Sequence, residues 1–538
     1  MFLALGGLLF LLYLGFMSFI SRIPPPLVQP TQGEVWPKPY RQVFLNYYYL
    51  VKPQTFRFRV VAQKCELLEK ALERYLRIID KTKISRNLFI KQNDETETKI
   101  FLGYLDTLNV YLKEACDNIT LPPYSMEEQY ILDVTTNKSN TTLSAASIWG
   151  IIRGLETFSQ LLYPVENEML RIECTEVIDL PRFPHRGLLV DTARHFIPMI
   201  KIYKILDAMS YNKLNVFHWH ITDDESFPYQ SIKYPELSKK GAFSRILVYS
   251  QENVRDIINY AAARGIRVLV EFDTPGHSKS WGKAIPTLLT QCYKLGKLSD
   301  ELGPIDPTKN STYTFLENFF EEVATVFPED YLHIGADEVR YDCWKSNPTI
   351  QMFMKNNKLL LHTHLEDYYI QKLLKIVHSL SKKPIVWEEA FVDGMTLPTS
   401  TTVQIWKDSA LGGWRSTARS ATAAGHLVLI SACWYLDHLT SGGDWGKFYN
   451  CEPLSFLGNQ LQTSMVLGGE ACMWTEVVNE YNIESRIWPR ASATAEKLWS
   501  KRDADTYRKA THRLEEHACR MIKRGIKAQP PNSAGFCI

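Results

Sequence analysis

The chain has 538 residues, more than one ordinary domain needs, and this length fits a large domain plus a smaller one. Hydrophobic residues make up 45% and charged residues 22%, the composition of a folded globular protein. The formal net charge is +2 and no run of lysine and arginine occurs, which argues against a nucleic-acid-binding protein. The 13 tryptophans and 27 tyrosines offer flat apolar faces with a polar edge, which suit sugar rings, although most are expected in the core.

The N-terminal segment predicts entry into the secretory pathway. Met1 to Ile20 carry no charge and are followed by Arg22 and three consecutive prolines. Twenty apolar residues are long enough to cross a bilayer, so residues 1–22 form either a cleaved signal peptide or a signal-anchor. Residues 23–34 are interpreted as a linker, and contact with a membrane is expected only if the first segment is retained.

Glycosylation signals and cysteine spacing agree with that compartment. Four acceptor triplets begin at Asn118, Asn137, Asn140 and Asn310. The ten cysteines lack CxxC spacing, which disfavours a zinc ribbon or a redox motif and permits disulfides. Spacing does not determine connectivity, but the local pairs Cys65–Cys116, Cys292–Cys343 and Cys519–Cys537 are reasonable expectations. The roles of Cys174, Cys433 and Cys451 stay open, and Cys472 is interpreted as a small buried hydrophobe.

Residues 35–180 are predicted to form a small non-catalytic α+β domain. The stretch from Thr55 alternates as a strand, Cys65 to Ile79 has helical spacing, and Tyr130 to Val134 is a further strand candidate. Ala145 to Leu162 is predicted as a long amphipathic helix. No catalytic cluster stands out in this part of the chain.

Residues 181–538 alternate short apolar runs with helical stretches, which predicts a (β/α)₈ TIM barrel whose active site lies at the C-terminal strand ends. A doubly wound sheet is the alternative, but no glycine-rich phosphate loop follows the first strand. The predicted helices include 200–213, 251–264 and 313–326. The eight predicted strands are 186–191, 215–223, 267–273, 331–337, 384–389, 402–407, 427–433 and 466–474.

Polar or aromatic residues close essentially every one of these strands, which favours a functional site over a purely structural interpretation. The fourth strand ends in the adjacent acids Asp337 and Glu338, which alone could merely cap the next helix. His218 and His220 share one face of the second strand, as metal ligands do, but tryptophans rather than further ligands follow on later strands. The histidines are therefore expected to orient acids through hydrogen bonds.

Glycoside hydrolysis fits this set of acids and aromatics, yet neighbours such as Asp337 and Glu338 cannot easily straddle a scissile bond as two catalytic carboxylates usually do. The segment from His333 to Glu338 resembles the His-x-Gly-Gly-Asp-Glu motif of glycoside hydrolase family 20, the β-N-acetylhexosaminidases. The resemblance extends from about Trp36 to Cys537 and is greatest to the animal lysosomal subunits of the β type. Further matching motifs are Pro184-His-Arg-Gly, His218-Trp-His, Phe272-Asp-Thr-Pro-Gly-His, Trp434-Tyr-Leu-Asp and Trp488-Pro-Arg-Ala. Ala336 departs from the usual glycine; we expect this methyl to be tolerated, with a slight tightening of the pocket.

The resemblance implies substrate-assisted retaining catalysis, in which the N-acetyl oxygen of the sugar attacks its own anomeric carbon. Glu338 would be the general acid and base, and Asp337 would orient the acetamide and stabilise its developing positive charge. The other implied site residues are Tyr435 on the acetamide oxygen, Trp387, Trp406 and Trp474 as walls, Arg186, Asp437 and Glu476 on sugar hydroxyls, and Asp223 and His277 as support for Glu338.

The resemblance also bears on substrates and partners. Asp437 followed by His438 places a carboxylate where an anionic substituent would lie, which favours neutral terminal N-acetylglucosamine and N-acetylgalactosamine. The stretch from Tyr293 lacks the Gly-Ser-Glu-Pro insert associated with ganglioside processing.

We expect a lysosomal homodimer that acts on glycans, without cofactor or metal. The rival hypotheses are an enzyme confined to N-glycan trimming or chitin fragments, and a catalytically silent sugar-binding barrel, which would be expected to lack Asp337 or Glu338.

Overall fold

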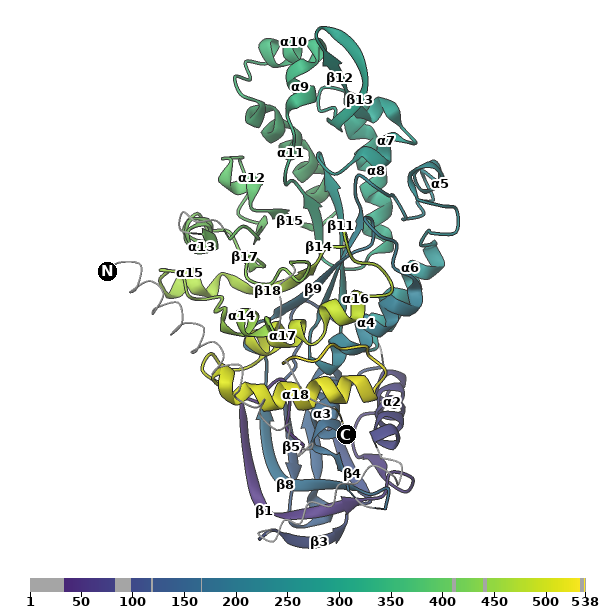
Figure 1. The fold of residues 1–538 in the computed structure, drawn as a ribbon, viewed down its shortest axis with the longest axis vertical. Coiled ribbons are helices and arrows are strands. Elements are labelled where there is room, and N and C mark those ends of the chain that lie inside the picture. The colour runs from purple at the N-terminus through teal and green to yellow at the C-terminus, as the bar shows by residue number, and fades with distance from the viewer. Residues whose placement is uncertain are drawn as a thin grey trace, which may run out of the picture.

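The computed structural model describes residues 33–82, 98–117, 120–165, 167–408, 413–438, 443–532 and 537. The predicted signal segment and the acceptor Asn118 lie outside these residues. Figure 1 shows a sheet domain at the bottom and a barrel above it, with the C-terminal helix crossing between them. No helix in the described part of the chain is long and apolar enough to cross a membrane.

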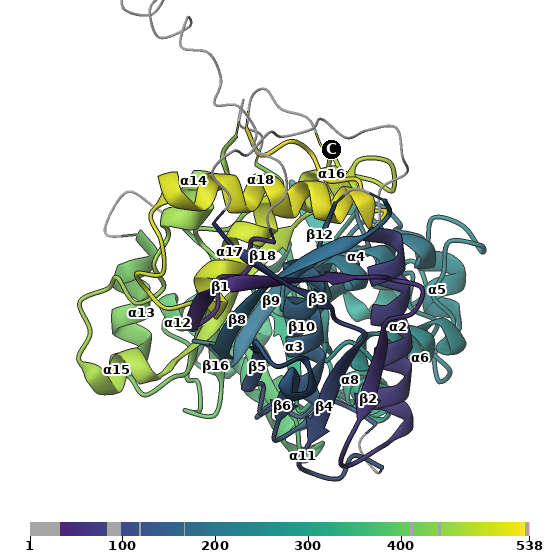
Figure 2. The same cartoon turned by 90° about the horizontal axis from the view of Figure 1, so that it is seen from below.

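The N-terminal domain is an eight-stranded mixed sheet with strand order β2-β4-β6-β5-β8-β1-β3, in which β7 pairs with β8. Figure 2 shows these strands from below, with α2 and α3 beside them. The elements are β1 (Arg41–Val51), β2 (Arg57–Val60), α2 (Glu66–Thr82), β3 (Ile100–Tyr104), β4 (Thr107–Leu112), β5 (Tyr130–Val134), η1 (Lys138–Asn140), β6 (Thr142–Ala145), α3 (Ile148–Leu161), β7 (Tyr163–Pro164) and β8 (Leu170–Asp179).

Eight parallel strands close into a barrel, as the sequence predicts, in the order β10-β11-β14-β15-β16-β17-β18-β9. Every residue of β9, β10, β11 and β18 is buried, because barrel strands are covered by helices outside and by side chains inside. The strands are β9 (His185–Asp191), β10 (Val216–Thr222), β11 (Arg267–Thr274), β14 (Tyr331–Gly335), β15 (Lys383–Trp387), β16 (Thr402–Ile405), β17 (Val428–Ile430) and β18 (Val466–Met473).

Helices and one hairpin fill the connections between the barrel strands. The longer predicted helices form, and Ser250 caps one of them in a reciprocal capping box with Asn253. The helices are α4 (Met199–Tyr211), α5 (Glu236–Gly241), α6 (Gln251–Ala262), α7 (Lys279–Gly282), η2 (Pro286–Leu288), α8 (Asn310–Val326), α9 (Asp342–Ser346), α10 (Pro348–Asn356), α11 (His362–Ser379), α12 (Glu389–Val392), α13 (Gly413–Ala423), α14 (Trp445–Asn450), α15 (Gln460–Ser464), α16 (Ile483–Ile487), α17 (Arg490–Trp499) and α18 (Tyr507–Lys523), and the hairpin is β12 (Leu289–Lys294) with β13 (Lys297–Ile305).

Helix α3 differs from the amphipathic helix that the sequence predicts, because it is buried on all sides. Its polar residues are buried because they bond across the domain junction. Arg153 donates to the backbone oxygens of Arg264 and Gly265 at 3.2 and 2.8 Å, and Arg524 beyond α18 forms an ion pair with Glu156 at 2.8 Å. Helix α3 therefore joins the sheet to the barrel through hydrogen bonds as well as apolar contact.

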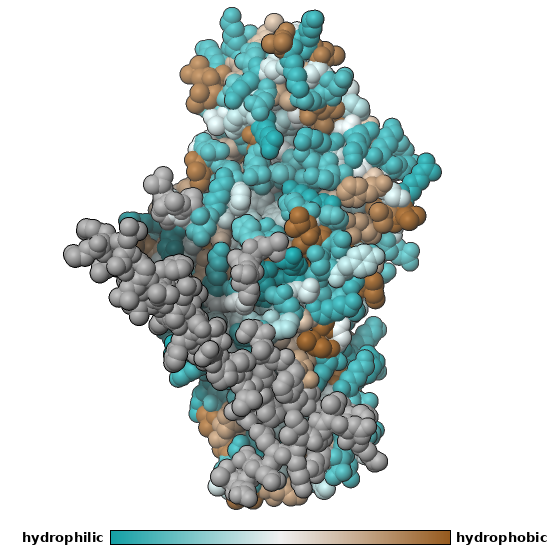
Figure 3. Space-filling model, viewed as in Figure 1, coloured by the Kyte–Doolittle hydropathy of each residue, from teal (hydrophilic) through white to brown (hydrophobic). Residues whose placement is uncertain are grey.

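Four disulfides cross-link the described part of the chain. Cys65–Cys116, Cys292–Cys343 and Cys519–Cys537 form as the sequence analysis expects, and Cys433–Cys451 is an additional pair. Cys174 and Cys472 are buried free thiols. The acceptors Asn137, Asn140 and Asn310 are all exposed. Figure 3 shows that the described part of one face is mostly hydrophilic, with small separate hydrophobic patches.

The backbone enters the left-handed region at Ala336, where φ is +74°, directly after Gly335 with the same φ. The Ala336 side chain is fully buried and belongs to the main hydrophobic core. The methyl therefore packs in the core, and its principal cost is backbone strain rather than a narrower site.

We expect Ala336→Gly to stabilise the fold by about 1 kcal/mol, because glycine adopts a positive φ without strain. Chemical denaturation measures the free energy of unfolding. Ala208→Gly, inside helix α4, is the matched control and should destabilise the protein. Equal destabilisation by the two substitutions would contradict the strain at position 336.

Candidate active site

The two acids of the fourth barrel strand lie in different environments. The Asp337 side chain is 12% exposed, whereas that of Glu338 is 58% exposed. Glu338 has a positive φ of +48°, which turns the chain sharply between the two residues. Helix capping does not explain the pair, because the next helix, α9, begins only at Asp342. Glu338 is accessible to a bound molecule, and Asp337 lies deeper.

A histidine and an aspartate connect these acids to the second and third strands. His277 Nε2 lies 3.8 Å from Glu338 Oε2 and 3.9 Å from Asp337 Oδ2. His277 Nδ1 lies 3.0 Å from Asp223 Oδ1, and Asp223 Oδ2 lies 2.9 Å from His220 Nε2. Burial opposes the charge of His277, but Asp337, Asp273 and Asp223 outweigh it and raise its pKa to about 11. A protonated His277 therefore faces both acids.

Asp273 supports Asp337 from the third strand. Burial and the nearby Asp337 carboxylate raise the pKa of Asp273 well above its ordinary value. Its Oδ1 also accepts a hydrogen bond of 3.0 Å from the backbone N–H of Ala336. One Asp337 oxygen, Oδ1, is buried without a hydrogen-bond partner. An unpaired buried carboxylate oxygen is costly, and it is suited to accept the N–H of a bound amide.

Four aromatic side chains gather around the strand ends after β15, β16, β17 and β18. The ring centroids of Trp387 and Trp474 are 6.0 Å apart, and those of Trp406 and Tyr435 are 5.8 Å apart in a stacked arrangement. Trp406 Nε1 donates to Glu389 at 2.9 Å, which fixes the plane of the ring. Trp406, Tyr435 and Trp474 are only partly buried, so they form an aromatic wall with accessible faces.

The residues expected to bind sugar hydroxyls are not all together. Asp437 and Glu476 follow β17 and β18, and burial raises the pKa of each carboxyl. Asp437 Oδ2 lies 3.7 Å from His438 Nε2, and its Oδ1 has no hydrogen-bond partner. Both residues belong to the same end of the barrel as the acid pair.

Arg186 does not lie at this end, and its prediction as a substrate-binding residue is wrong. It stands second in β9, at the amino end of the barrel, and is fully buried. Its guanidinium pairs with Glu128 at 2.6 Å and donates to the backbone oxygens of Lys213 and Phe183. The motif around Arg186 is thus structural, because a strand start lies a whole barrel length from the strand ends.

The arginine that does lie at the strand ends is Arg194, three residues after β9. Its guanidinium pairs with Asp223 at 2.7 Å and lies over the Trp474 ring at 5.1 Å. Burial disfavours its charge, but Asp191 and Asp223 outweigh this and raise its pKa. In the sequence, Arg194 differs from Arg186 in that it lies just beyond the end of a strand, where barrel active sites form.

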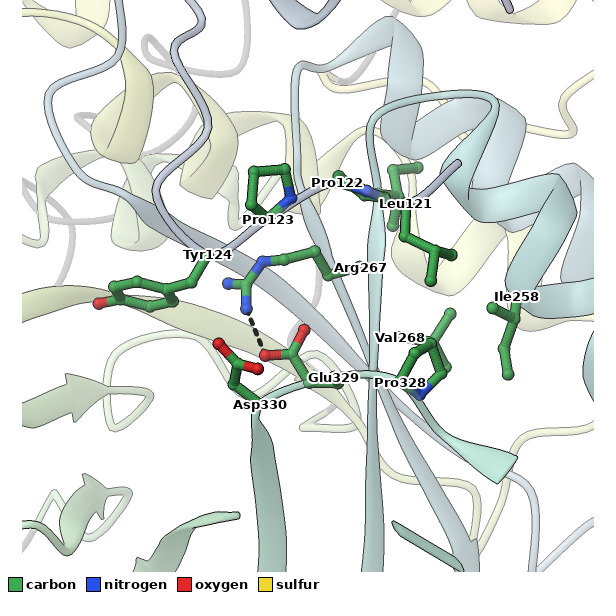
Figure 4. Close-up of a pocket in the computed structure, with 11 residues that line it drawn as sticks. Leu121, Pro122, Pro123, Tyr124, Ile258, Arg267, Val268, Pro328, Glu329 and Asp330 are labelled. Atoms are coloured by element: carbon green, nitrogen blue, oxygen red, sulfur yellow. Dashed lines mark hydrogen bonds and ion pairs between the residues drawn. The ribbon is translucent and has the colours of Figure 1, made fainter. Parts of the chain in front are cut away.

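A separate cavity of about 210 Å³ lies at the opposite end of the barrel (Figure 4). Arg267 pairs there with Glu329 at 2.7 Å, beneath the loop from Leu121 to Tyr124. None of the predicted site residues lines it. The lining residues are Leu121, Pro122, Pro123, Tyr124, Ile258, Ile266, Arg267, Val268, Pro328, Glu329 and Asp330.

The barrel interior below the acid pair is filled by alternating histidines and carboxylates. Burial opposes the charge of His218 and His220, but the adjacent carboxylates raise the pKa of His218 to about 9 and of His220 to about 10. Burial likewise opposes the charge of Glu271 and Glu470, but the histidines lower the pKa of both carboxyls. His218 and His220 thus orient acids, as the sequence predicts. His218, Glu271 and His333 also have a spacing that would suit a metal ion, but the first two already serve each other as ion-pair partners.

These pKa shifts predict how stability depends on pH. The raised pKa values of His218 and His220 stabilise the fold fully below their ordinary pKa of 6.5, and this stabilisation is lost as pH rises toward 9 to 10. The lowered pKa of Glu470 stabilises the fold above its ordinary pKa of 4.5 and is lost in acid. The charged pairs of His218, His220 and Glu470 should therefore stabilise the fold most between about pH 4.5 and 6.5.

Urea denaturation at pH 5.5, 7 and 8.5 measures this dependence. Each histidine that is protonated only in the folded state lowers the free energy of unfolding by about 1.4 kcal/mol per pH unit above its unfolded pKa. A free energy of unfolding that is higher at pH 8.5 than at pH 5.5 would contradict the raised pKa values of His218 and His220.

Comparison with known proteins agrees with this geometry. Residues 183–502 match the family "Glycosyl hydrolase family 20, catalytic domain", and residues 35–161 match "beta-acetyl hexosaminidase like". The chain is 46% identical to cat β-hexosaminidase subunit beta over 474 residues, 88% of this chain and 87% of that protein. It is 42% identical to the rat alpha subunit over 510 residues, 94% of each. Its fold matches a Flavobacterium johnsoniae chitobiase with a TM-score of 0.77 and 29% identity, over 91% of this chain and 73% of the other.

Proposed function

Because the chain belongs to glycoside hydrolase family 20, we propose that it removes terminal, non-reducing N-acetyl-β-D-glucosamine and N-acetyl-β-D-galactosamine residues from glycans. The observation that carries the proposal is the pairing of an exposed acid, Glu338, with a deeper acid, Asp337, beside an aromatic wall. A catalytically silent sugar-binding barrel is not favoured, because both acids are present and share His277.

We assign the proton transfers to Glu338. In the first step it protonates the leaving oxygen while the substrate's own acetamide oxygen attacks the anomeric carbon, which gives a cyclic oxazolinium-type intermediate. In the second step the Glu338 carboxylate takes a proton from the water that opens this ring, and the anomeric configuration is retained. The protonated His277, 3.8 Å away, stabilises the carboxylate between the two steps.

We assign the substrate's nucleophile to Asp337 and the aromatic wall. The unpaired oxygen of Asp337 accepts the acetamide N–H and stabilises the positive charge that develops on that nitrogen. The Tyr435 hydroxyl donates to the acetamide oxygen, and Trp387, Trp406 and Trp474 hold the acetamide and the ring. This division of labour needs no second catalytic carboxylate across the site.

We assign recognition of the non-reducing end to Arg194, Asp437 and Glu476. Arg194 replaces Arg186 in this role, because it lies at the strand ends. The carboxylate of Asp437 repels an anionic substituent, so the proposed substrates are neutral sugars.

The wider biological setting completes the proposal. Animal β-hexosaminidase relatives suggest a secretory or lysosomal protein, and we propose the lysosome. The relatives are subunits by name, and we propose a homodimer for this chain. We also propose that residues 35–180 form the non-catalytic domain and residues 181–538 the catalytic barrel. Asn137, Asn140 and Asn310 are exposed and are proposed to carry glycans.

Glu338→Gln tests the role of the general acid. Because the amide cannot donate a proton, kcat for chitobiose should fall by about 10³-fold. With nitrophenyl N-acetyl-β-D-glucosaminide the rate of the first step should fall less, because nitrophenolate is a leaving group that needs no protonation. Release of sugar from both substrates measures the effect. If wild type and Glu338→Gln were equally inactive on both substrates while sugar still bound, the chain would be a binding protein instead.

A thiazoline analogue of the N-acetyl sugar tests the substrate-assisted route. It mimics the cyclic intermediate, so it should inhibit competitively, and Asp337→Asn should weaken its affinity by about 100-fold through loss of the charge opposite the ring nitrogen. Asp224→Asn, a change in an exposed ion pair with Lys279, is the control and should leave the inhibition constant unchanged. Absence of inhibition, together with covalent trapping of an enzyme carboxylate, would exclude the mechanism.

A further inference from the structure

One buried carboxylate, Glu271, lies within 3.1 Å of four side chains on three other strands. Its Oε2 lies 2.8 Å from His220 Nδ1 and 2.9 Å from His218 Nε2. Its Oε1 lies 2.8 Å from Trp387 Nε1 and 3.1 Å from His333 Nδ1. Glu271 is wholly buried, so every one of these contacts is shielded from water.

Two of these contacts lead to different parts of the proposed site. Trp387 is buried and donates to Glu271, and its ring centroid lies 6.0 Å from that of Trp474, so Glu271 reaches the aromatic wall through Trp387. Through His220 it reaches Asp223, then His277 and then Glu338, by consecutive separations of 2.8, 2.9, 3.0 and 3.8 Å. Glu271 is thus the point at which the acetamide wall and the proton-transfer group meet.

We propose that Glu271 is a positioning residue that holds Trp387 in place and keeps His220 positively charged, so that Asp223 and His277 stay aligned on Glu338. This inference rests on the proposed function. Glu271 touches no substrate in this arrangement; it acts through the ring of Trp387 and through the His220–Asp223 pair.

The groups around this path show that the histidine charge depends on Glu271. His220 has one carboxylate on each side, Glu271 and Asp223, and the edge of its ring meets Trp474. Asp223 also pairs with Arg194 and His277, whereas among the described residues Glu271 and Asp223 are the two anions that pair with His220. The other charged groups that face the path are His218 on β10, Asp273 on β11, His333 on β14, Glu470 on β18 and Glu225 beyond β10.

The acid Glu470 offers a matched control, because it occupies the same kind of buried position one histidine further from the site. It pairs with His185 at 2.6 Å and His218 at 2.7 Å, and it accepts from Gln404, but it contacts neither His220 nor Trp387. A purely structural role for buried carboxylates would make the two positions equivalent.

The experiment compares Glu271→Gln, Glu470→Gln and Trp387→Phe in the full-length enzyme. Without the Glu271 charge, His220 should lose its proton within the working pH range, and the basic limb of the kcat/KM profile should move to lower pH by about one unit or more. Glu470→Gln should keep the wild-type profile. Trp387→Phe, which lacks the indole N–H donor and has a smaller ring, should raise KM about 10-fold and leave the profile in place.

Histidine NMR provides a readout that is independent of activity. With ¹³C-labelled histidine, the His220 signal should not titrate between pH 5 and 8 in wild type or Glu470→Gln, but should titrate in Glu271→Gln. If the wild-type protein were inactive on glycosides, the proposed function would be refuted. The NMR titration would still test whether Glu271 keeps His220 charged.

Two results would overturn the positioning role of Glu271. One is a folded Glu271→Gln enzyme with the wild-type pH profile and no new histidine titration; the other is the same kinetic change in Glu470→Gln. If Glu271→Gln does not fold, the His220→Gln variant tests the positioning role instead, because this variant keeps the hydrogen bond between Trp387 and Glu271. It should lower kcat/KM about 10-fold with KM unchanged, and an unchanged kcat/KM would refute the proposal.

Discussion

The buried ion pairs between histidines and carboxylates inside the barrel are the constraint on which the site depends. Glu271, His220, Asp223 and His277 form a continuous series of alternating acids and bases that leads to the site, with separations of 2.8 to 3.0 Å. Each charge is tolerated in a water-free interior only because its neighbours have the opposite sign. This mutual dependence fixes side-chain orientations that apolar packing would leave free.

The proposed chemistry lies at the exposed end of that series. The positively charged His277 faces the two acids, and Asp273, whose pKa is raised by burial and by Asp337, lies close to Asp337. One acid is therefore accessible and next to a cation, and the other is buried with an unpaired oxygen. Two adjacent residues of the same chemical type acquire different roles because their surroundings differ.

The opposite end of the barrel uses similar residues for a different purpose. Glu128 pairs with Arg153 of α3 and Arg186 of β9, and so joins the sheet domain to the start of the first barrel strand. Burial favours the uncharged forms of these groups, but each keeps an opposite charge within 2.8 Å. Arginines near the two ends of β9 thus both form ion pairs, and their position relative to the strand distinguishes the structural Arg186 from Arg194 beside the proposed site.

The sequence by itself determined the fold and the principal acids. Eight apolar runs that end in polar residues specify a parallel barrel, since buried strands and their exposed ends have a strong local pattern, and Asp337 and Glu338 stand at one such end. The tertiary structure decided what depends on distant partners: the burial of α3 on all sides, the Cys433–Cys451 pairing and the choice of Arg194 over Arg186. It also showed that Glu271 meets four side chains from three other strands. No local pattern contains these contacts, because closure of the barrel brings together residues that are up to 285 positions apart.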